Sequence, residues 1–327
     1  MTLKQTAGPE RAEAPGPDAG PAPRRGRPSH RLQRYGPAYA MLLPFALLFT
    51  VFLIYPLGRS FYYSLTDFNG IKAPEFVGFD NFTELFRGDD RFHKAIWNTL
   101  KYVVFSVVLT IALGLVLAVA FKTTSMRDRL MRTILFLPSV SAGVGVILVW
   151  RWIFMVDSWG LGNTVVRFFG GENRAWLAEP AVSIPVLVAM AVWGGAGYAM
   201  VLFVAGINAI PDELYEQASI DGASKGRQFW HITLPLLRPV LVFVIITSTI
   251  GAFQIFEPVY LLWRRSASIV GGPLDSALTI VPYLYDMGFN RFQLGYASAI
   301  AWVLFLIIFL VTLVQLRVTK TFKEFEK

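Results

Sequence analysis

Two groups of polar residues stand out among the apolar runs of this chain, and neither has the composition of a catalytic site. The first is the segment from Glu216 to Ala223, which continues to Pro235 and lies between two long apolar runs. The second is Glu257, the one carboxylate well inside a stretch long enough to cross a membrane. A carboxylate at membrane depth is costly and by default faces a bundle interior or a water-filled cavity. These residues therefore point to partner contact and solute passage rather than to bond chemistry.

Several kinds of chemistry are excluded by the residues that are missing or scattered. The chain has no cysteine, and its three histidines, His30, His93 and His231, lie far apart, which excludes thiolate chemistry and argues against a histidine metal site or a clustered acid–base centre. No phosphate-binding G-x-x-x-x-G-K-[ST] sequence occurs, so we expect no ATP site and no cofactor on this chain. The first 36 residues carry seven Lys/Arg against three Asp/Glu, in a Pro-rich tail rather than on a folded basic face, so nucleic acid is not an expected partner.

Long apolar segments must position these polar groups. With 54% hydrophobic and 16% charged residues and a mean hydropathy of +0.50, the composition is that of a polytopic membrane protein. Windows of about 20 residues match a hydrocarbon core of about 30 Å. The sequence predicts six spans: Ala38–Leu57, Asn98–Phe121, Ile134–Phe154, Ala181–Ile207, Leu241–Trp263 and Ser298–Leu316.

The distribution of Lys and Arg predicts the direction of the spans. The N-terminal arm, the loop at 122–132 and the tail at 317–327 are basic, and they alternate with loops of mixed or acidic balance. Basic loops stay in the cytoplasm. We therefore expect a multi-pass protein of the plasma or inner membrane with both termini in the cytoplasm and the loop at 212–238 on the same side. The pair Arg264-Arg265 runs against this rule.

The polar loop reads as two short helices joined at a glycine. Asp212 is predicted as the N-cap of the first helix, with Glu213 and Glu216 near the positive end of its dipole. Gly222 interrupts the helix because a residue without a side chain does so at little cost. The second helix is predicted from about Ser224 to Thr233, with its end at Pro235. Such an element could dock a partner or lie as a re-entry helix on the headgroups.

The pattern E-x-A-x-x-D-G-A, followed by I-x-L-P, resembles the EAA loop of ABC-importer permeases, with Gln217 where that family most often has Ala. The resemblance implies an all-α type I importer permease with six spans and a coupling loop at about 211–238, on which an ATPase subunit pushes. The composition predicts a disordered basic cytoplasmic tail, 1–36, and the resemblance covers a permease domain, 37–327. The coupling residues that it implies are Glu216, Ala218, Asp221, Gly222, Ala223, Ile232, Leu234 and Pro235.

Further short patterns resemble carbohydrate-type permeases, in particular the maltose-type F subunit. They are Phe76 to Phe82 with Asn98-Thr99, Gly160 to Asn163, Gly271-Gly272-Pro273, and the run from Tyr283 through Phe289 to Gly295-Tyr296 and Ala299. By this resemblance and by polarity within spans, the candidate substrate-path residues are Trp193, Gly195, Tyr198, Ser248, Gly251, Gln254, Ile255 and Glu257. Because several are small or apolar where the relatives carry Asn or Phe, direct contact with sugar and simple helix packing both stay open.

The resemblance also implies partners. They are a second, paralogous permease, two ATPase subunits that carry ATP and Mg, an extracytoplasmic substrate-binding protein, a sugar or oligosaccharide, and the lipid bilayer. A phosphate ester or an amino acid is the alternative substrate. An ion-coupled secondary transporter is a remote alternative, since it predicts repeated halves and several embedded carboxylates, and only one is evident.

Overall fold

The computed structural model describes residues 30–123, 125–141, 143–156, 159–263 and 270–319. Within them the chain is almost entirely helical, as the composition predicts. Most of the predicted N-terminal tail and the pair Arg264-Arg265 lie outside the described residues. The chain divides into two compact units, Met1–Pro56 and Leu57–Lys327, which are taken separately below.

The first unit is a helical arm. It contains α1 (His30–Phe49), a π-helical turn η1 (Thr50–Ile54) and the first residues of α2 (Tyr55–Ser64). The run Tyr39–Ser64 is long and apolar enough to cross a membrane. The helix begins at His30, within the predicted tail of residues 1–36, most of which lies outside the described residues.

The second unit holds the remaining helices and one two-stranded sheet, in which β1 pairs antiparallel with β2 through Thr66↔Phe76. Its elements after α2 are β1 (Thr66–Asp67), β2 (Glu75–Phe76), α3 (Asp80–Arg87), α4 (Asp90–Ala120), α5 (Met126–Val140), α6 (Gly143–Ile153), α7 (Leu161–Phe168), η2 (Trp176–Ala178), α8 (Pro180–Asn208), α9 (Asp212–Ile220), α10 (Lys225–Gln228), η3 (Phe229–Thr233), α11 (Leu234–Leu236), α12 (Arg238–Phe253), α13 (Glu257–Trp263), η4 (Pro273–Asp275), α14 (Ile280–Tyr285), η5 (Asp286–Asn290) and α15 (Leu294–Val318).

Four of the predicted spans match single helical runs, and the third and fifth fall on bent pairs of helices, the fifth only over residues 241–253. By length and composition, the described part of the chain has four helices able to cross a membrane, in α1–α2, α4, α8 and α15, and up to six spans if each bent pair is one span. The pairs are α5 with α6, and Lys225–Leu236 with α12. Six spans are therefore reached only if each bent pair counts as one span, and the second pair includes residues 225–236, which belong to the predicted coupling loop.

The predicted fifth span, Leu241–Trp263, is not one helix. α12 ends at Phe253, and α13 starts at Glu257. Pro258 has no N–H for the carbonyl of Gln254, and a proline disfavours helical geometry at the residue before it. Glu257 therefore stands at the start of a short helix instead of in the middle of a span, which corrects the prediction.

Close approach of backbones holds α4, α5 and α8 together. A side chain at Gly114 of α4 would lie 2.7 Å from the Cβ of Ala199 on α8. A side chain at Gly197 of α8 would overlap the carbonyl of Leu135 on α5. Small residues at such crossings let membrane helices approach closely. Inside a bilayer no hydrophobic force drives helices together, so they associate through this close van der Waals packing.

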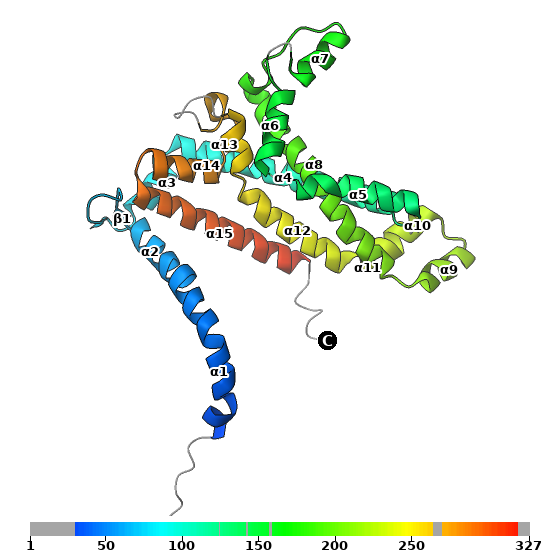
Figure 1. Ribbon diagram of the computed structural model, residues 1–327, viewed down its shortest axis with the longest axis horizontal. Helices are drawn as coiled ribbons and strands as arrows, with labels where there is room; N and C mark the ends of the chain where they lie inside the picture. Colours follow the sequence, from blue (N-terminus) through cyan, green and yellow to red (C-terminus); the bar gives the residue numbers. More distant parts are fainter. Residues whose placement is uncertain (1–29, 124, 142, 157–158, 264–269, 320–327) are drawn as a thin grey trace, which may run out of the picture. The chain divides into compact units, whose positions relative to one another are not determined.

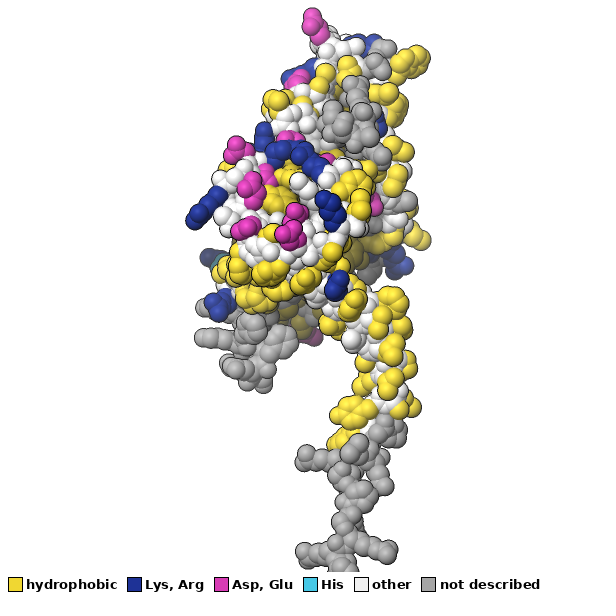
Figure 2. Space-filling view, turned by 90° about the vertical axis from the view of Figure 1, so that its left-hand side faces the viewer, with side chains coloured by type: hydrophobic (Ala, Val, Ile, Leu, Met, Phe, Trp, Pro, Cys, Tyr) yellow, Lys and Arg dark blue, Asp and Glu magenta, His cyan; other side chains and the backbone are white. Residues whose placement is uncertain are grey.

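The two ends of this unit carry different elements. Figure 1 shows α3 and α14 at one end, beside the starts of α4 and α15, and α9 with α10 at the other end. Figure 2 looks at the α3–α14 end and shows Asp, Glu, Lys and Arg side chains gathered on it, with hydrophobic side chains around them. The candidate sites lie at these two ends and at the break between α12 and α13.

Candidate functional site

The turn after α9 explains the spacing of the polar loop. The amide of Ala223 donates to the carbonyl of Ala218 at 2.8 Å, and the amide of Gly222 donates to the carbonyl of Ser219 at 3.1 Å. These two bonds define a Schellman C-cap, in which the residue at the Gly222 position adopts left-handed geometry. Gly222 has φ +75°, so glycine is the residue that fits there at least cost. The predicted interruption at Gly222 is confirmed.

The second half of the loop is longer than predicted. Ser224 caps α10 by accepting from the amide of Arg227, and the helix continues through the π turn η3 and α11 to Leu236. It therefore does not end at Pro235. The amide of Leu234 bonds to the carbonyl of Phe229, five residues back, so the widened turn accommodates the missing N–H of Pro235. The predicted N-cap is also shifted, because Pro211 occupies that position and Asp212 is the first helical residue.

Side-chain bonds fix α9 to the helix that follows it. The hydroxyls of Tyr215 and Thr233 share a hydrogen bond of 2.9 Å. The amide of Gln228 donates to the Ser219 hydroxyl at 2.9 Å and to the Ala223 carbonyl at 3.2 Å. The loop is therefore a preformed element with a defined angle between its two arms.

The exposed side of this element carries acidic and apolar residues together. Glu216, Asp221 and Gly222 are exposed, and Ala218, Ala223, Ile232 and Leu234 are half-buried. Ile220 is 86% exposed and Trp230 is 64% exposed, which is more apolar surface than a solvated loop needs. We name this surface, formed by Glu216, Ile220, Asp221, Gly222 and Trp230, the docking face. These exposed residues combine charged and apolar side chains, as protein-contact surfaces do.

The predicted path residues of α8 have different surroundings. Trp193 packs edge-on against Trp150 of α6 at 5.9 Å between ring centroids, and Tyr198 is exposed. Gly195 faces α4, since a side chain there would lie 3.0 Å from the Cγ2 of Thr110. Gly195 thus allows α8 to pack closely against α4, while the rings of Trp193 and Tyr198 are partly exposed at the surface of this chain.

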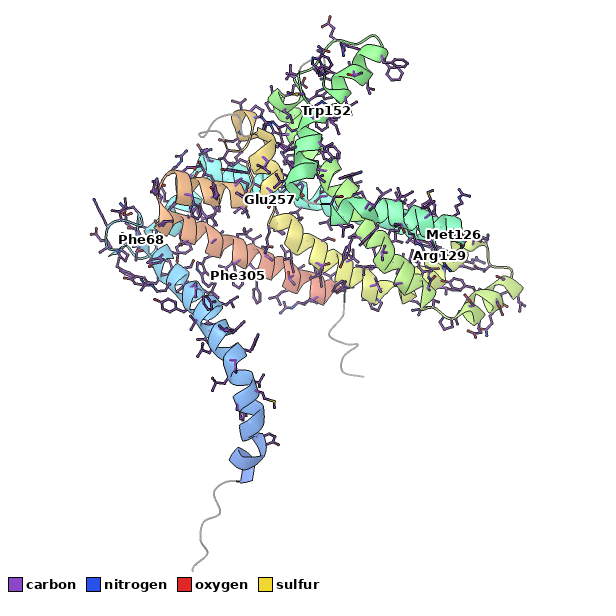
Figure 3. The ribbon with its side chains drawn as sticks, viewed as in Figure 1. Phe68, Met126, Arg129, Trp152, Glu257 and Phe305 are labelled. Carbon is purple, nitrogen blue, oxygen red and sulfur yellow. The ribbon has the colours of Figure 1, made fainter. Side chains whose placement is uncertain are left out.

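The path residues of α12 and α13 gather around the helix break. Gly251, Gln254 and Glu257 are exposed and Ser248 is half-buried, whereas Ile255 is buried. The Oε2 atom of Glu257 lies 2.9 Å from the place that a Cβ of Gly143 would occupy. The carboxylate therefore stands beside the first residue of α6, where free amides and the helix dipole favour negative charge. Figure 3 shows Glu257 at the start of α13, next to the lower end of α6.

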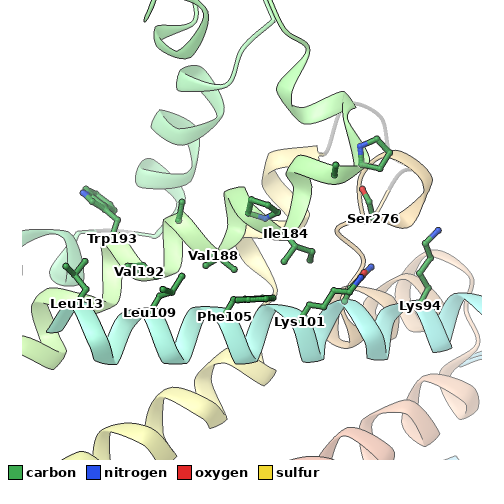
Figure 4. A pocket seen from close by; sticks show the side chains of 15 residues that line it. Lys94, Lys101, Phe105, Leu109, Leu113, Ile184, Val188, Val192, Trp193 and Ser276 are labelled. Atoms are coloured by element: carbon green, nitrogen blue, oxygen red, sulfur yellow. The ribbon is translucent and has the colours of Figure 1, made fainter. Parts of the chain in front are cut away.

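A large cavity lies apart from the polar groups of the α12–α13 break. It is an open groove between α4 and α8 with a volume of about 970 Å³. Figure 4 shows Phe105, Leu109 and Leu113 along α4 facing Ile184, Val188 and Val192 of α8, with Lys94 and Lys101 at one end. Walls of this kind suit hydrocarbon and offer few partners for sugar hydroxyls.

A cluster of ion pairs and hydrogen bonds between α4 and the segment at 275–296, named the outer anchor because the sequence predicts this end to lie outside, was not recognised from the sequence. Arg91 forms a two-bonded ion pair with Asp275, with both bonds at 2.9 Å, and contacts Asp286 at 3.3 Å. The Asn98 amide donates to the carbonyls of Asp275 and Leu278, at 2.9 and 3.1 Å. These contacts join residues that are almost 200 positions apart in the sequence.

Two tyrosines complete the outer anchor. The phenols of Tyr283 and Tyr296 both donate to one oxygen of Asp89, the N-cap of α4. Burial, and then the Asp89 carboxylate, raise the pKa of Tyr283 above its ordinary value, so the phenol remains the donor. Thr99 accepts from the amide of Ile280 at 3.0 Å. The short patterns around Asn98-Thr99, Tyr283 and Tyr296 contain residues of this anchor. From the sequence, these patterns were recognised only as a family resemblance and could not be assigned a structural role.

Comparison with known proteins matches these features to one family. The family model for the binding-protein-dependent transport system inner membrane component matches residues 110–324. The chain is similar to the probable ABC transporter permease protein YesP of Bacillus subtilis (strain 168), with 36% identity over 88% of this chain and 92% of that protein. It is similar to the arabinooligosaccharides transport system permease protein AraP of the same organism, with 34% identity over 87% and 89%.

Solved structures agree on the fold. The crystal structure of a bacterial ABC transporter involved in the import of the acidic polysaccharide alginate contains a chain that superposes with a TM-score of 0.76. The identity is 24%, and the match covers 89% of this chain and 97% of that chain. The type I importer permease fold expected from the loop pattern is therefore confirmed. With a family model that matches most of its length and relatives that align along nearly all of it, the chain belongs to the binding-protein-dependent transport system inner membrane components, the permease subunits of ABC transporters.

Proposed function

We propose that this chain is one of two permease subunits in an ABC importer that moves a sugar or an oligosaccharide inward from an extracytoplasmic binding protein. The observation that carries the proposal is the preformed loop of α9 to α11, whose docking face exposes Glu216 and Ile220 on a turn fixed at Gly222. An ion-coupled secondary transporter has no use for such an element, because no ATPase pushes on it.

The similar proteins support a sugar substrate. They include permeases named for arabinooligosaccharides, diacetylchitobiose and lactose, each at least 32% identical to this chain over 85% or more of its length. A phosphate ester would call for basic groups near the path. The α12–α13 break instead offers Gln254 and Glu257, which accept and donate hydrogen bonds as sugar hydroxyls require. We propose that these two residues, with Gly251, Trp193 and Tyr198, line the sugar's path between the two permeases.

The partners follow from the same loop. We propose one copy of this chain, one related permease and two ATPase subunits that bind ATP and Mg. Since the basic loops and α9 belong to the same side, both termini lie in the cytoplasm of a plasma or inner membrane. ATP-driven closure of the ATPase pair then moves the docking face, and the helices attached to it re-orient the path.

A reconstitution experiment tests the proposal. The complex is purified from its native membrane through a tag on this chain, its other chains are identified, and it is placed in proteoliposomes with its binding protein. We expect ATP-dependent uptake of one of three saccharides, an arabino-oligosaccharide, lactose or diacetylchitobiose. Glycerol 3-phosphate and histidine serve as the alternative substrates. Uptake of only those two would refute the sugar assignment, and ATP hydrolysis by the purified chain alone would refute its role as a permease subunit.

A further inference from the structure

A cavity lies where the inner end of α4 meets the loop, and its walls divide into a cationic side and an apolar side. Its volume is about 260 Å³. Lys122, Lys225, Gln228, Tyr215 and Thr233 supply the polar wall, and Val119, Ile207 and Phe229 supply the apolar wall. The size suits a phosphate group with a short attached fragment.

Among the described residues, no carboxylate forms an ion pair with either ammonium group of this cavity. None of its lining residues is acidic, and neither Lys122 nor Lys225 forms an ion pair within the part of the chain that the structure describes. Asp128 is close in sequence, but its carboxylate accepts from the amide and the hydroxyl of Thr123. The cavity therefore carries positive charge that an anion would compensate.

The position of Lys122 is held by its neighbours. Its Nζ lies 5.6 Å from the ring centroid of Tyr215, in cation–π geometry, and the hydroxyl of Tyr215 is in turn bonded to Thr233 at 2.9 Å. An ammonium over a ring keeps its N–H donors available for a phosphate oxygen. Gln228 is likewise held by its bonds to Ser219 and Ala223.

From this arrangement we propose that the cavity binds the phosphate of an anionic glycerophospholipid, with Lys122 and Lys225 on the phosphate and Val119 and Phe229 on the first carbons of the glycerol and acyl chains. A free phosphate would meet the same lysines but would leave the apolar wall unfilled. The site lies at the end of the spanning helices, where headgroups are found, and basic residues there attract anionic lipid. The bound lipid would join α4 to the loop of α9 and α10.

The test uses the whole complex purified in detergent, with native mass spectrometry of retained lipid. The probes are phosphatidylglycerol and phosphatidylcholine of the same acyl chains, and inorganic phosphate. We expect selective retention of phosphatidylglycerol, and a loss of about 30-fold in its affinity in the double variant Lys122→Gln, Lys225→Gln, taking about 1 kcal/mol for each lysine. The double variant Lys122→Arg, Lys225→Arg should retain the lipid, which shows that the fold is intact.

A matched control removes two positive charges elsewhere. Lys72 and Arg87 are exposed at the α3 end of the unit, and their change to Gln should leave lipid retention unaltered. Equal loss in this control, or no loss in the Lys122 and Lys225 variant, would overturn the proposal. Phosphate binding that depends on both lysines without preference for phosphatidylglycerol would overturn the lipid assignment. Because retention is measured without transport, the result is independent of whether the loop couples to an ATPase.

Discussion

Substitutions of Gly222 can show whether this position requires glycine because of its backbone conformation or because a side chain would clash with a partner at the docking face. Gly222 has φ +75°, and, its two chain neighbours aside, no atom of the described residues lies within 4 Å of a Cβ built there. The cost within the chain is therefore the left-handed conformation alone, about 1–2 kcal/mol for an ordinary residue. Asn tolerates this conformation and should cost less, while a β-branched residue should cost more.

The expected order of damage is thus Asn, then Ala, then Val. A cost of 1–2 kcal/mol lowers the population of the native turn by a factor of about 5–30 relative to its alternatives. Coupled uptake and binding-protein-stimulated ATP hydrolysis are measured on the reconstituted complex, together with hydrogen exchange of the Ala223 amide, which bonds to Ala218 in the native turn. Exchange should accelerate in the same order as uptake declines.

Gly226 provides the matched control. It also has open space around it, but its φ is not positive and it lies in α10. Gly226→Ala should therefore be neutral or slightly stabilising, by up to about 1 kcal/mol. The strain argument would be refuted if Gly222→Asn reduced uptake as much as Gly222→Val while hydrogen exchange of the Ala223 amide stayed normal. Side-chain volume at the proposed ATPase interface would then explain the loss of uptake.

Three further predictions concern other parts of the chain. Arg91→Lys, which cannot form the two-bonded pair with Asp275, should lower the thermal stability of the purified complex by about 1–3 kcal/mol, and Arg91→Gln by more; unchanged melting would contradict the outer anchor. Glu257→Gln should change the rate of uptake more than the amount of assembled complex, whereas lost assembly with normal uptake per complex would make it structural. Cysteines at Gln217 and Thr83, both exposed, should be labelled from opposite sides of the membrane; labelling from one side would overturn the topology.

The long helices could be predicted because their cause is local. A run of apolar residues sufficient to cross the bilayer is visible in composition alone. α8 and α15 contain their predicted segments, and α4 contains its segment except for Phe121, which is the C-cap. α4 starts at Asp90, eight residues before the predicted start, because its first turns are polar and extend past the apolar run. The break in the fifth span had a local signal that hydropathy ignores, the pair Glu257-Pro258.

The candidate sites could be predicted only as far as they depend on residues that are close together in the sequence. The turn at Gly222 is determined by neighbouring residues, so the sequence pattern predicted it. The helix continues past Pro235 because of a π turn, and no spacing rule predicts a π turn. The outer anchor joins Arg91 to Asp275 across 184 positions. A single sequence gives no means of pairing charges at that separation, and the cavity at Lys122 depends on a similar long-range fit.

The outer anchor lies at the start of α4, and the cation–π contact of Lys122 lies just after its end. α4 has 31 residues, which at 1.5 Å per residue is about 46 Å of unbroken helix. Its first turns hold Asp275 and Tyr283, and the residues after its last turn hold Tyr215 of α9. α4 is therefore one continuous helix between the two ends of the unit, and a tilt of this helix at its α9 end would displace the surface formed by Asp275 and Tyr283 at its other end.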